Sequence, residues 1–179
     1  MKINRFDKIY FLGIGGIGMS SIAQFFLESG KNVAGYDKVK TELTDYLEKQ
    51  GAKIHYKPDL HKIPENFKIK DKTLVVYTPA IDSENEELKF FRNSDFLVLK
   101  RSDVLANISE NKFCIAIAGT HGKTTTSSIL SHILFENNLK FSSFVGGISE
   151  NYNNNYLNNG QEIIVVEADE FDKSFLKLS

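Results

Sequence analysis

Two glycine-rich turns, each between an apolar run and a helical pattern, constrain the fold of this chain more than any other feature of its sequence. The first is FLGIGGIGMSS, Phe11 to Ser21, and the second is CIAIAGTHGKTTTSSIL, Cys114 to Leu130. A strand that passes through a glycine turn into a helix presents backbone amides and the positive end of a helix dipole to an anion. The sequence therefore predicts two strand–turn–helix units that can each hold phosphate.

Short apolar runs alternate with helical patterns, which predicts an α/β architecture. Runs such as TLVVY, FCIAIA and IIVVE are almost continuously apolar, as expected for parallel strands covered on both faces. The expected strands are Lys8–Leu12, Asn32–Tyr36, Lys53–His55, Thr73–Tyr77, Phe96–Leu99, Phe113–Ala118, Phe141–Phe144 and Glu162–Glu167. The expected helices are Gly18–Ser29, Thr41–Gln50, Glu84–Arg92, Ser102–Ile108 and Lys123–Asn137.

The segment KRSDVLANISENK has no strand character and precedes the second glycine turn, so we place a domain boundary near residue 108. Residues 1–107 are expected to form a Rossmann-like parallel sheet domain, and residues 108–179 the start of a P-loop-type α/β domain that binds ATP. The asparagine-rich segment SENYNNNYLNNGQ is interpreted as a long surface loop.

Several side chains receive packing roles at this stage. In the helix after the second turn, Ile129, Leu130, Ile133 and Leu134 can share one apolar face. The histidines outside the turn, which have no partner visible in the sequence, are expected to be surface or packing residues; they are His55, His61 and His132.

Composition limits the classes of partner. The formal net charge of −1 gives no general attraction for nucleic acid or an anionic membrane, so any anion must be held locally. One cysteine, Cys114 in an apolar strand, fits a reducing cytoplasm and a core position. The N-terminal apolar run is too short for a signal peptide or a membrane span. We therefore expect a cytoplasmic protein without nucleic-acid or membrane partners.

The first turn matches GxGxxG and is followed by an acidic residue at the end of the next strand, Asp37. Glycines let the backbone approach a diphosphate, and the acidic residue is placed to bind a ribose hydroxyl. The pattern does not distinguish NAD from another nucleotide diphosphate. The candidate substrate-binding residues are Gly13, Gly15, Gly16, Ile17, Gly18 and Asp37.

The second turn is a shortened phosphate loop. The common form GxxxxGK(S/T) would have its first glycine at position 117, where this chain has Ile117. Lys123 can still bring its charge to the terminal phosphates, and the Thr124 hydroxyl can bind Mg²⁺. The candidate ATP-binding residues are Gly119, Thr120, His121, Gly122, Lys123, Thr124 and Thr125.

A carboxylate for the metal follows the last apolar run. Glu167 should lie at the carboxyl end of its strand, on the same sheet edge as the phosphate loop. Thr124 and Glu167 are therefore the predicted magnesium ligands. Of the acidic residues that follow, Asp169 and Glu170 are candidates to orient a metal-bound water, and Asp172 is interpreted as a helix cap.

Three stretches, FLGIGGIGMSSIA, AGTHGKTTT and VVEADEFDKSFL, together resemble the Mur ligases of peptidoglycan synthesis, most closely those that add L-alanine. The resemblance covers essentially the whole chain, including LKRSDVLANI at the proposed boundary. It implies that the first domain binds the UDP part of UDP-N-acetylmuramic acid, with the diphosphate at Gly13–Gly18 and the uridine facing Asp37. The second domain would bind ATP and Mg²⁺ through Lys123, Thr124 and Glu167.

The resemblance also implies a reaction. ATP phosphorylates the muramoyl carboxylate, the amine of L-alanine attacks the acyl phosphate, and an amide forms with release of phosphate. Lys123 and the Glu167-bound magnesium would be the catalytic groups, because they stabilise charge on the migrating phosphoryl group.

The chain departs from the family pattern in three respects. Tyr77-Thr78-Pro79-Ala80 stands where many relatives carry a Ser-Ser pair, and Phe171 where many carry serine. The chain also ends inside the central one of three domains, which implies that the alanine-binding domain is missing. We therefore expect an N-terminal piece of a longer ligase that is inactive alone.

Three alternatives remain open from the sequence. An NAD-dependent oxidoreductase would explain the first turn and Asp37, but not Gly119–Thr126. A nucleotide-binding regulatory protein would need no catalytic completion. A sister ligase that joins a preformed peptide to the same sugar nucleotide would carry a similar phosphate loop.

Overall fold

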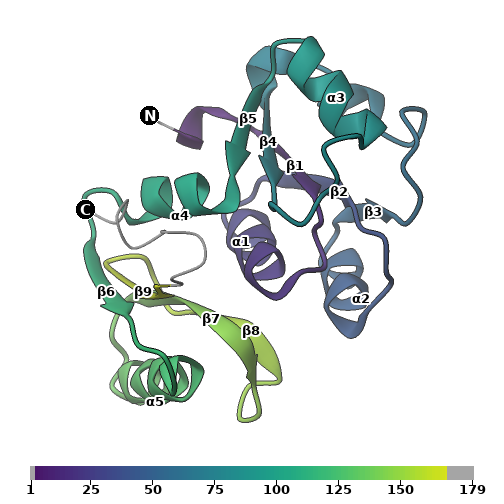
Figure 1. The fold of residues 1–179 in the computed structure, drawn as a ribbon. Helices are drawn as coiled ribbons and strands as arrows, with labels where there is room; N and C mark the ends of the chain where they lie inside the picture. Colours follow the sequence, from purple (N-terminus) through teal and green to yellow (C-terminus); the bar gives the residue numbers. More distant parts are fainter. Residues whose placement is uncertain (1–2, 169–179) are drawn as a thin grey trace. The chain divides into compact units, whose positions relative to one another are not determined.

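The computed structural model describes residues 3–168 and divides the chain into two compact units, Met1–Val104 and Leu105–Ser179 (Figure 1). The division falls inside the helix α4 (Arg101–Ser109), whereas the sequence analysis placed the boundary near the end of the same helix. Among residues 3–168, no helix combines the length and the apolar character that a membrane span requires.

The first unit is built on a five-stranded parallel sheet with the order β3-β2-β1-β4-β5. This is the strand order of a Rossmann-like fold, so the predicted fold class is confirmed. The strands are β1 (Lys8–Leu12), β2 (Asn32–Tyr36), β3 (Lys53–His55), β4 (Thr73–Tyr77) and β5 (Leu97–Lys100). The helices are α1 (Ile17–Glu28), α2 (Glu42–Lys49) and α3 (Glu86–Asn93), with short 3-10 helices at Ile3–Arg5, Glu65–Phe67 and Lys70–Lys72.

The central strand β1 is buried on both faces. Its successive side chains point to opposite sides of the sheet, and each side is covered by other residues. Tyr10 packs toward α3, where its ring lies 4.8 Å from that of Phe91. Phe11 points the other way, and its ring lies 6.4 Å from that of Phe26 in α1. The first glycine turn follows β1, so it opens at the point where the strand order reverses, which is where such sheets bind ligands.

Local capping signals fix where two helices of this unit begin. Thr41 and Thr44 form a reciprocal capping box at the start of α2, with backbone-to-hydroxyl distances of 2.9 and 3.3 Å. The Asn85 side chain accepts hydrogen bonds from the backbone amides of Glu87 and Leu88, both at 3.0 Å, and so caps α3.

The second unit contains a four-stranded sheet with the order β6-β9-β7-β8 and the helix α5 (Lys123–Glu136). The strands are β6 (Phe113–Ile117), β7 (Phe141–Ser149), β8 (Asn154–Asn158) and β9 (Ile163–Glu167). The first three in spatial order are parallel, and Ile117 pairs with Glu167. The carboxyl ends of β6 and β9 therefore lie at the same edge of the sheet.

The interpretation of the asparagine-rich segment as a long surface loop is wrong. It contains β8, which pairs antiparallel with β7. Tyr156 is buried, and its ring lies 5.3 Å from that of Phe144. The Asn158 carboxamide oxygen accepts hydrogen bonds from Ser142 and Gly160 at the end of the hairpin. Asparagine side chains of the edge strand β8 thus form hydrogen bonds with neighbouring backbone and side chains. Composition alone does not reveal this role.

The predicted apolar face of α5 is also partly wrong, because Ile129 and Ile133 are 57% and 51% exposed. Leu130 and Leu134 do pack on the sheet. They share their stripe with two fully buried serines, Ser127 and Ser131, whose small side chains let the helix lie close to the strands.

Among the described residues, strand β6 lies at the edge of its sheet, and Phe113 is 69% exposed. Cys114 is half-buried there rather than in a closed core. Burial raises the pKa of its thiol, although a hydrogen bond with Ser109 acts in the opposite direction. The thiol is therefore kept protonated, as expected of a packing residue.

Candidate functional site

The first glycine turn is hydrogen-bonded to the end of β2. The amides of Gly13 and Ile14 both donate to the carbonyl of Tyr36, at 2.8 and 3.1 Å. Gly13 has a φ of 87°, and a Cβ on it would lie 2.6 Å from the Thr78 methyl group. Only glycine fits this bend without displacing its neighbour.

Asp37, the residue after β2, also contacts the first glycine turn. Its carboxylate accepts hydrogen bonds from the amides of Gly15, at 2.7 Å, and Val39, at 3.1 Å. The sequence predicted that Asp37 would lie beside the ligand, and the structure brings it directly to the glycine turn. In doing so it fixes the orientation of the peptide group between Ile14 and Gly15.

The helix α1 begins without a side-chain cap. Its N-cap, Gly16, makes no side-chain capping bond, and the first turn contains no acidic residue. Gly16 is exposed, and a Cβ on it would meet only ordinary contacts, the closest at 3.6 Å. Ile17 and Gly18 are the first two residues of the helix and are half-buried. An anion can therefore approach the start of this helix.

Sequence reasoning missed Arg101 as a residue of this turn. Its guanidinium group lies against Gly18, where a Cβ would collide with it. A guanidinium group and the positive end of a helix dipole both attract negative charge. The signal in the sequence was the stretch LKRSDVLANI, which we used only for the domain boundary and for the resemblance.

The second glycine turn joins β6 to α5 and bends at two glycines with positive φ, Gly119 at 145° and Gly122 at 76°. Thr120 and His121 between them are exposed. The Lys123 ammonium group donates to the Gly119 carbonyl at 2.6 Å, so the lysine folds back over its own loop. This is the position from which it would reach a phosphate lying on the loop.

Glu167 lies directly against this turn. Its Oε2 accepts a hydrogen bond from the Thr124 hydroxyl at 3.1 Å, and its Oε1 accepts one from Ser127 at 2.6 Å. The amide of Gly146 donates to Oε1 at 2.9 Å, and a Cβ on Gly146 would collide with the carboxylate. The structure thus brings together the two residues predicted to bind magnesium, and it adds two partners that the sequence did not reveal.

The geometry fits Mg²⁺. Two oxygen ligands about 2.1 Å from an octahedral ion and at right angles to one another lie about 3 Å apart. The 3.1 Å between Thr124 Oγ1 and Glu167 Oε2 matches this separation. Within the described part of the chain, no group of three or more His, Cys, Asp or Glu side chains could hold a metal. An ion bound here would therefore draw its other ligands from water and phosphate, as Mg²⁺ commonly does.

A surface hollow of about 360 Å³ lies beside the start of α5. Thr125, the last predicted ATP-binding residue, lines it together with Ser128 and residues at the end of β7. Asp169, Glu170, Phe171 and Asp172, to which the sequence analysis assigned roles or a departure, lie outside the described residues.

Each unit therefore has a glycine turn between a parallel strand and a helix, and the second turn carries a lysine, a threonine and a facing carboxylate. This arrangement is typical of proteins that bind nucleotide phosphates on α/β units. The model of the Mur ligase family catalytic domain matches residues 8–113. The chain belongs to the Mur ligase family.

Individual relatives support this assignment. The chain is 48% identical over 178 residues to a UDP-N-acetylmuramate–L-alanine ligase of Flavobacterium psychrophilum, covering 99% of this chain and 40% of that protein. It is 48% identical over 176 residues to the ligase of the same name from Parabacteroides distasonis, covering 98% and 38%. The chain thus spans about two fifths of the length of these relatives.

Solved structures agree. The crystal structure of a UDP-N-acetylmuramate–alanine ligase from Thermotoga maritima matches with a TM-score of 0.77 at 34% identity, over 91% of this chain and 37% of that one. The UDP-N-acetylmuramate:L-alanyl-γ-D-glutamyl-meso-diaminopimelate ligase of Neisseria meningitides matches with a TM-score of 0.83 at 25% identity, over 97% and 58%.

Proposed function

We propose that this chain carries the sugar-nucleotide and ATP sites of an ATP-dependent ligase that joins L-alanine to UDP-N-acetylmuramic acid. The observation that carries the proposal is the contact between Thr124 and Glu167 beside Lys123, in a chain whose curated relatives bear that enzyme's name. The product would be a peptidoglycan precursor made in the cytoplasm for the cell wall.

In the second unit, each residue has a distinct task. The backbone amides of the Gly119–Thr124 turn would bind the ATP phosphates, and Lys123 would leave the Gly119 carbonyl to contact the terminal ones. Thr124 and Glu167 would hold Mg²⁺, which neutralises phosphate charge when bound. These groups would favour transfer of the terminal phosphoryl group to the muramoyl carboxylate.

In the first unit, the Gly13–Gly18 turn would bind the diphosphate of the sugar nucleotide. The open start of α1 and the Arg101 guanidinium both favour negative charge at this place. Asp37 would act by holding the Gly15 amide in place, in addition to any contact with the nucleoside. Binding of both nucleotides by one protein would supply the proximity that phosphoryl transfer to the muramoyl carboxylate requires.

Thermal unfolding of the 179-residue chain with four ligands tests this proposal. UDP-N-acetylmuramic acid, UDP and ATP–Mg²⁺ are each expected to raise the melting temperature, whereas NAD is not. A ligand present at about a hundred times its Kd adds roughly 2.7 kcal/mol to the free energy of unfolding. Stabilisation by NAD alone would contradict the proposal and favour the oxidoreductase.

The sister ligase that adds a preformed peptide is the second candidate, because the Neisseria meningitides peptide ligase shares the fold with a TM-score of 0.83. Among the solved structures, the identity to the alanine ligase is higher than that to the peptide ligase, 34% against 25%, which favours alanine as the added group. A competition between L-alanine and the tripeptide in the full-length protein distinguishes the two.

A further inference from the structure

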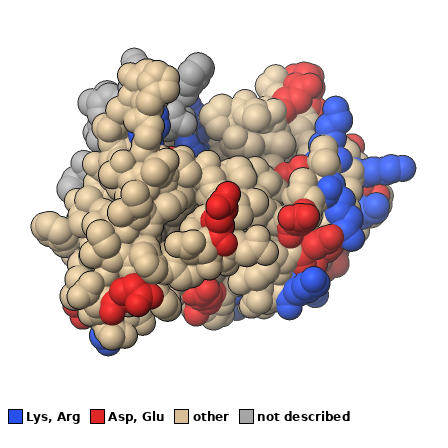
Figure 2. All heavy atoms as spheres, turned by 90° about the horizontal axis from the view of Figure 1, so that it is seen from below, with Lys and Arg blue, Asp and Glu red and all other residues tan. Residues whose placement is uncertain are grey.

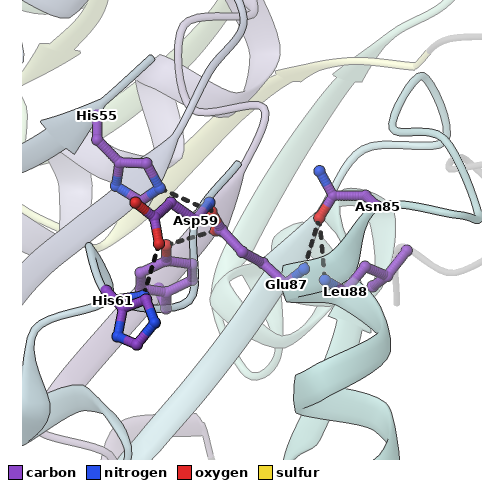
Figure 3. Close-up of polar contacts among 7 residues, drawn as sticks. His55, Asp59, His61, Asn85, Glu87 and Leu88 are labelled. Carbon is purple, nitrogen blue, oxygen red and sulfur yellow. Dashed lines mark hydrogen bonds and ion pairs between the residues drawn. The ribbon is translucent and has the colours of Figure 1, made fainter. Parts of the chain in front are cut away.

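A buried carboxylate of the first unit is not part of its glycine turn. Glu87, in the first turn of α3, is fully buried, and Figure 3 shows its side chain extending from the helix toward His55 and Asp59. Its Oε1 accepts hydrogen bonds from His55 Nε2, at 2.7 Å, and from the Asp59 amide, at 2.9 Å. Its Oε2 accepts one from the Tyr10 hydroxyl at 2.7 Å.

A buried carboxylate is costly unless donors surround it, so these three contacts act as one unit. Burial raises the pKa of Tyr10, and the nearby Glu87 charge raises it further, so the phenol stays protonated and remains a donor. An ionised carboxylate has only acceptors to offer, so the hydrogen bond with His55 places the imidazole proton on Nε2. Glu87 thereby connects β1, β3, the segment after β3 and α3.

The connection continues from His55 to the first glycine turn. His55 is the last residue of β3 and pairs with Tyr36, against whose ring its own ring lies at 5.8 Å. The His55 carbonyl accepts a hydrogen bond from the Asp37 amide at 3.1 Å. The Asp37 carboxylate in turn accepts the Gly15 amide at 2.7 Å. An unbroken series of contacts therefore leads from Glu87 to the turn.

Strand β3 needs such an anchor because it is short. It has three residues, lies at the edge of the sheet and pairs with β2 alone. So short a ladder fixes the strand end weakly. The His55 side chain is only 10% exposed, so its bond to Glu87 holds the end of β3 from inside the unit.

We propose that Glu87 and His55 are positioning residues for the nucleotide site of the first unit. They hold the end of β3 so that Asp37, bonded to the Gly15 amide, keeps the backbone of the glycine turn in place for the diphosphate. In this role both residues act through Asp37 rather than through the ligand. The inference rests on the proposed function, because it takes the ligand of this turn to be the diphosphate of UDP.

Four variants of the 179-residue chain separate this role from simple stabilisation of the core. Glu87→Gln removes acceptor capacity from the whole cluster, and His55→Leu removes only the branch that leads to Asp37. His55→Gln restores a donor near the position of Nε2. Tyr10→Phe disturbs the same carboxylate from the opposite side and leaves the His55 contact in place.

Two readouts are measured for each variant: the Kd for UDP by calorimetry and the position of the Gly15 amide resonance by NMR. Glu87→Gln and His55→Leu are expected to raise the Kd about tenfold and to move the Gly15 resonance in the absence of ligand. His55→Gln and Tyr10→Phe are expected to stay within about twofold of the unchanged chain. Melting temperatures are recorded for all four variants.

The inference is overturned if His55→Leu binds UDP as tightly as the unchanged chain, or if the loss of affinity follows the loss of melting temperature across all variants, Tyr10→Phe included. Should Glu87→Gln fail to fold, the pair His55→Leu and His55→Gln still decides the question. If the unchanged chain does not bind UDP, the proposed function fails instead, and the two failures are thus distinguishable.

Discussion

Ser127 donates a 2.6 Å hydrogen bond to Oε1 of Glu167, the oxygen that faces away from Thr124. Ser127 is fully buried one turn along α5 from Thr124. The bond holds the carboxylate so that its other oxygen points at the threonine hydroxyl. The serine therefore sets the geometry of the pair that we propose to bind magnesium.

Ser127→Ala should weaken magnesium binding without removing a ligand. A lost hydrogen bond to a charged group costs about 1.5–3 kcal/mol, which corresponds to roughly 10- to 150-fold in affinity at most, and relaxation of the carboxylate reduces this. We expect the Mg²⁺ concentration for half-maximal ATP binding to rise about tenfold. Ser131→Ala, which removes a buried serine of the same helix that contacts Ser143 rather than Glu167, is the control and should bind normally. Equal behaviour of the two variants would remove Ser127 from the site.

Lys123→Ala in the full-length protein should lower kcat by about 10²- to 10³-fold, as expected for the loss of one group that stabilises charge in the transition state. Lys123→Arg should restore little, because a planar guanidinium group cannot replace a compact ammonium group within a tight loop. Binding of UDP-N-acetylmuramic acid should persist in both variants. Steady-state kinetics together with calorimetry check these outcomes, and near-normal turnover would exclude Lys123 from the reaction.

Glu167→Gln keeps the shape of the side chain and removes its charge. Since the charge is what attracts the metal, a higher Mg²⁺ concentration should relieve part of the defect, whereas it should not relieve the defect of Lys123→Ala. Titrating kcat with Mg²⁺ for both variants makes the comparison. The same response to Mg²⁺ in both would show that Glu167 does not act through the metal.

Gly16→Ala separates ligand binding from folding in the first turn. Gly16 has a φ of −64°, and a Cβ added to it would meet no close neighbour, so alanine should leave the melting temperature within a few degrees. The methyl group would nevertheless point where the diphosphate approaches, and the affinity for UDP should fall. Gly13→Ala, which would place a Cβ 2.6 Å from Thr78, should destabilise the fold as well. Unchanged UDP affinity in a stable Gly16→Ala protein would place the diphosphate elsewhere.

Strands β1, β2 and β4 of the first unit could be predicted from the sequence because most of their residues are buried and few are charged. The bounds of β1 to β4 match the expectation residue for residue. Strand β8 could not be predicted, because asparagine is a residue typical of turns. Its pairing with β7 is a tertiary contact that no local pattern indicates. The buried face of helix α5 was predicted wrongly for a related reason. Ser127 and Ser131 contact the strands, whereas isoleucines were expected to do so.

The two turns and Glu167 were visible in the sequence because they depend on local motifs at the ends of strands. Their support was not visible. Glu87 reads as a surface glutamate in the run SENEELKFF, and His55 appeared to have no partner, yet the two form a 2.7 Å contact. His132 likewise contacts the Tyr152 hydroxyl at 2.7 Å. Such long-range pairs follow from the fold and from no local pattern.

The distribution of charge agrees with sites that bind anions locally. On the face drawn in Figure 2, acidic and basic side chains lie next to one another, and a broad area carries few charges. Phosphate binding would depend on the glycine turns, Lys123 and Arg101.

The most direct test of the proposed ligase activity is the release of phosphate from ATP by the full-length protein. It is measured with each substrate omitted in turn. We predict that release requires both UDP-N-acetylmuramic acid and L-alanine, and that the 179-residue chain alone binds UDP and ATP–Mg²⁺ but releases no phosphate. Release that requires the preformed tripeptide in place of L-alanine, or no release with any combination of these substrates, would contradict the proposed function.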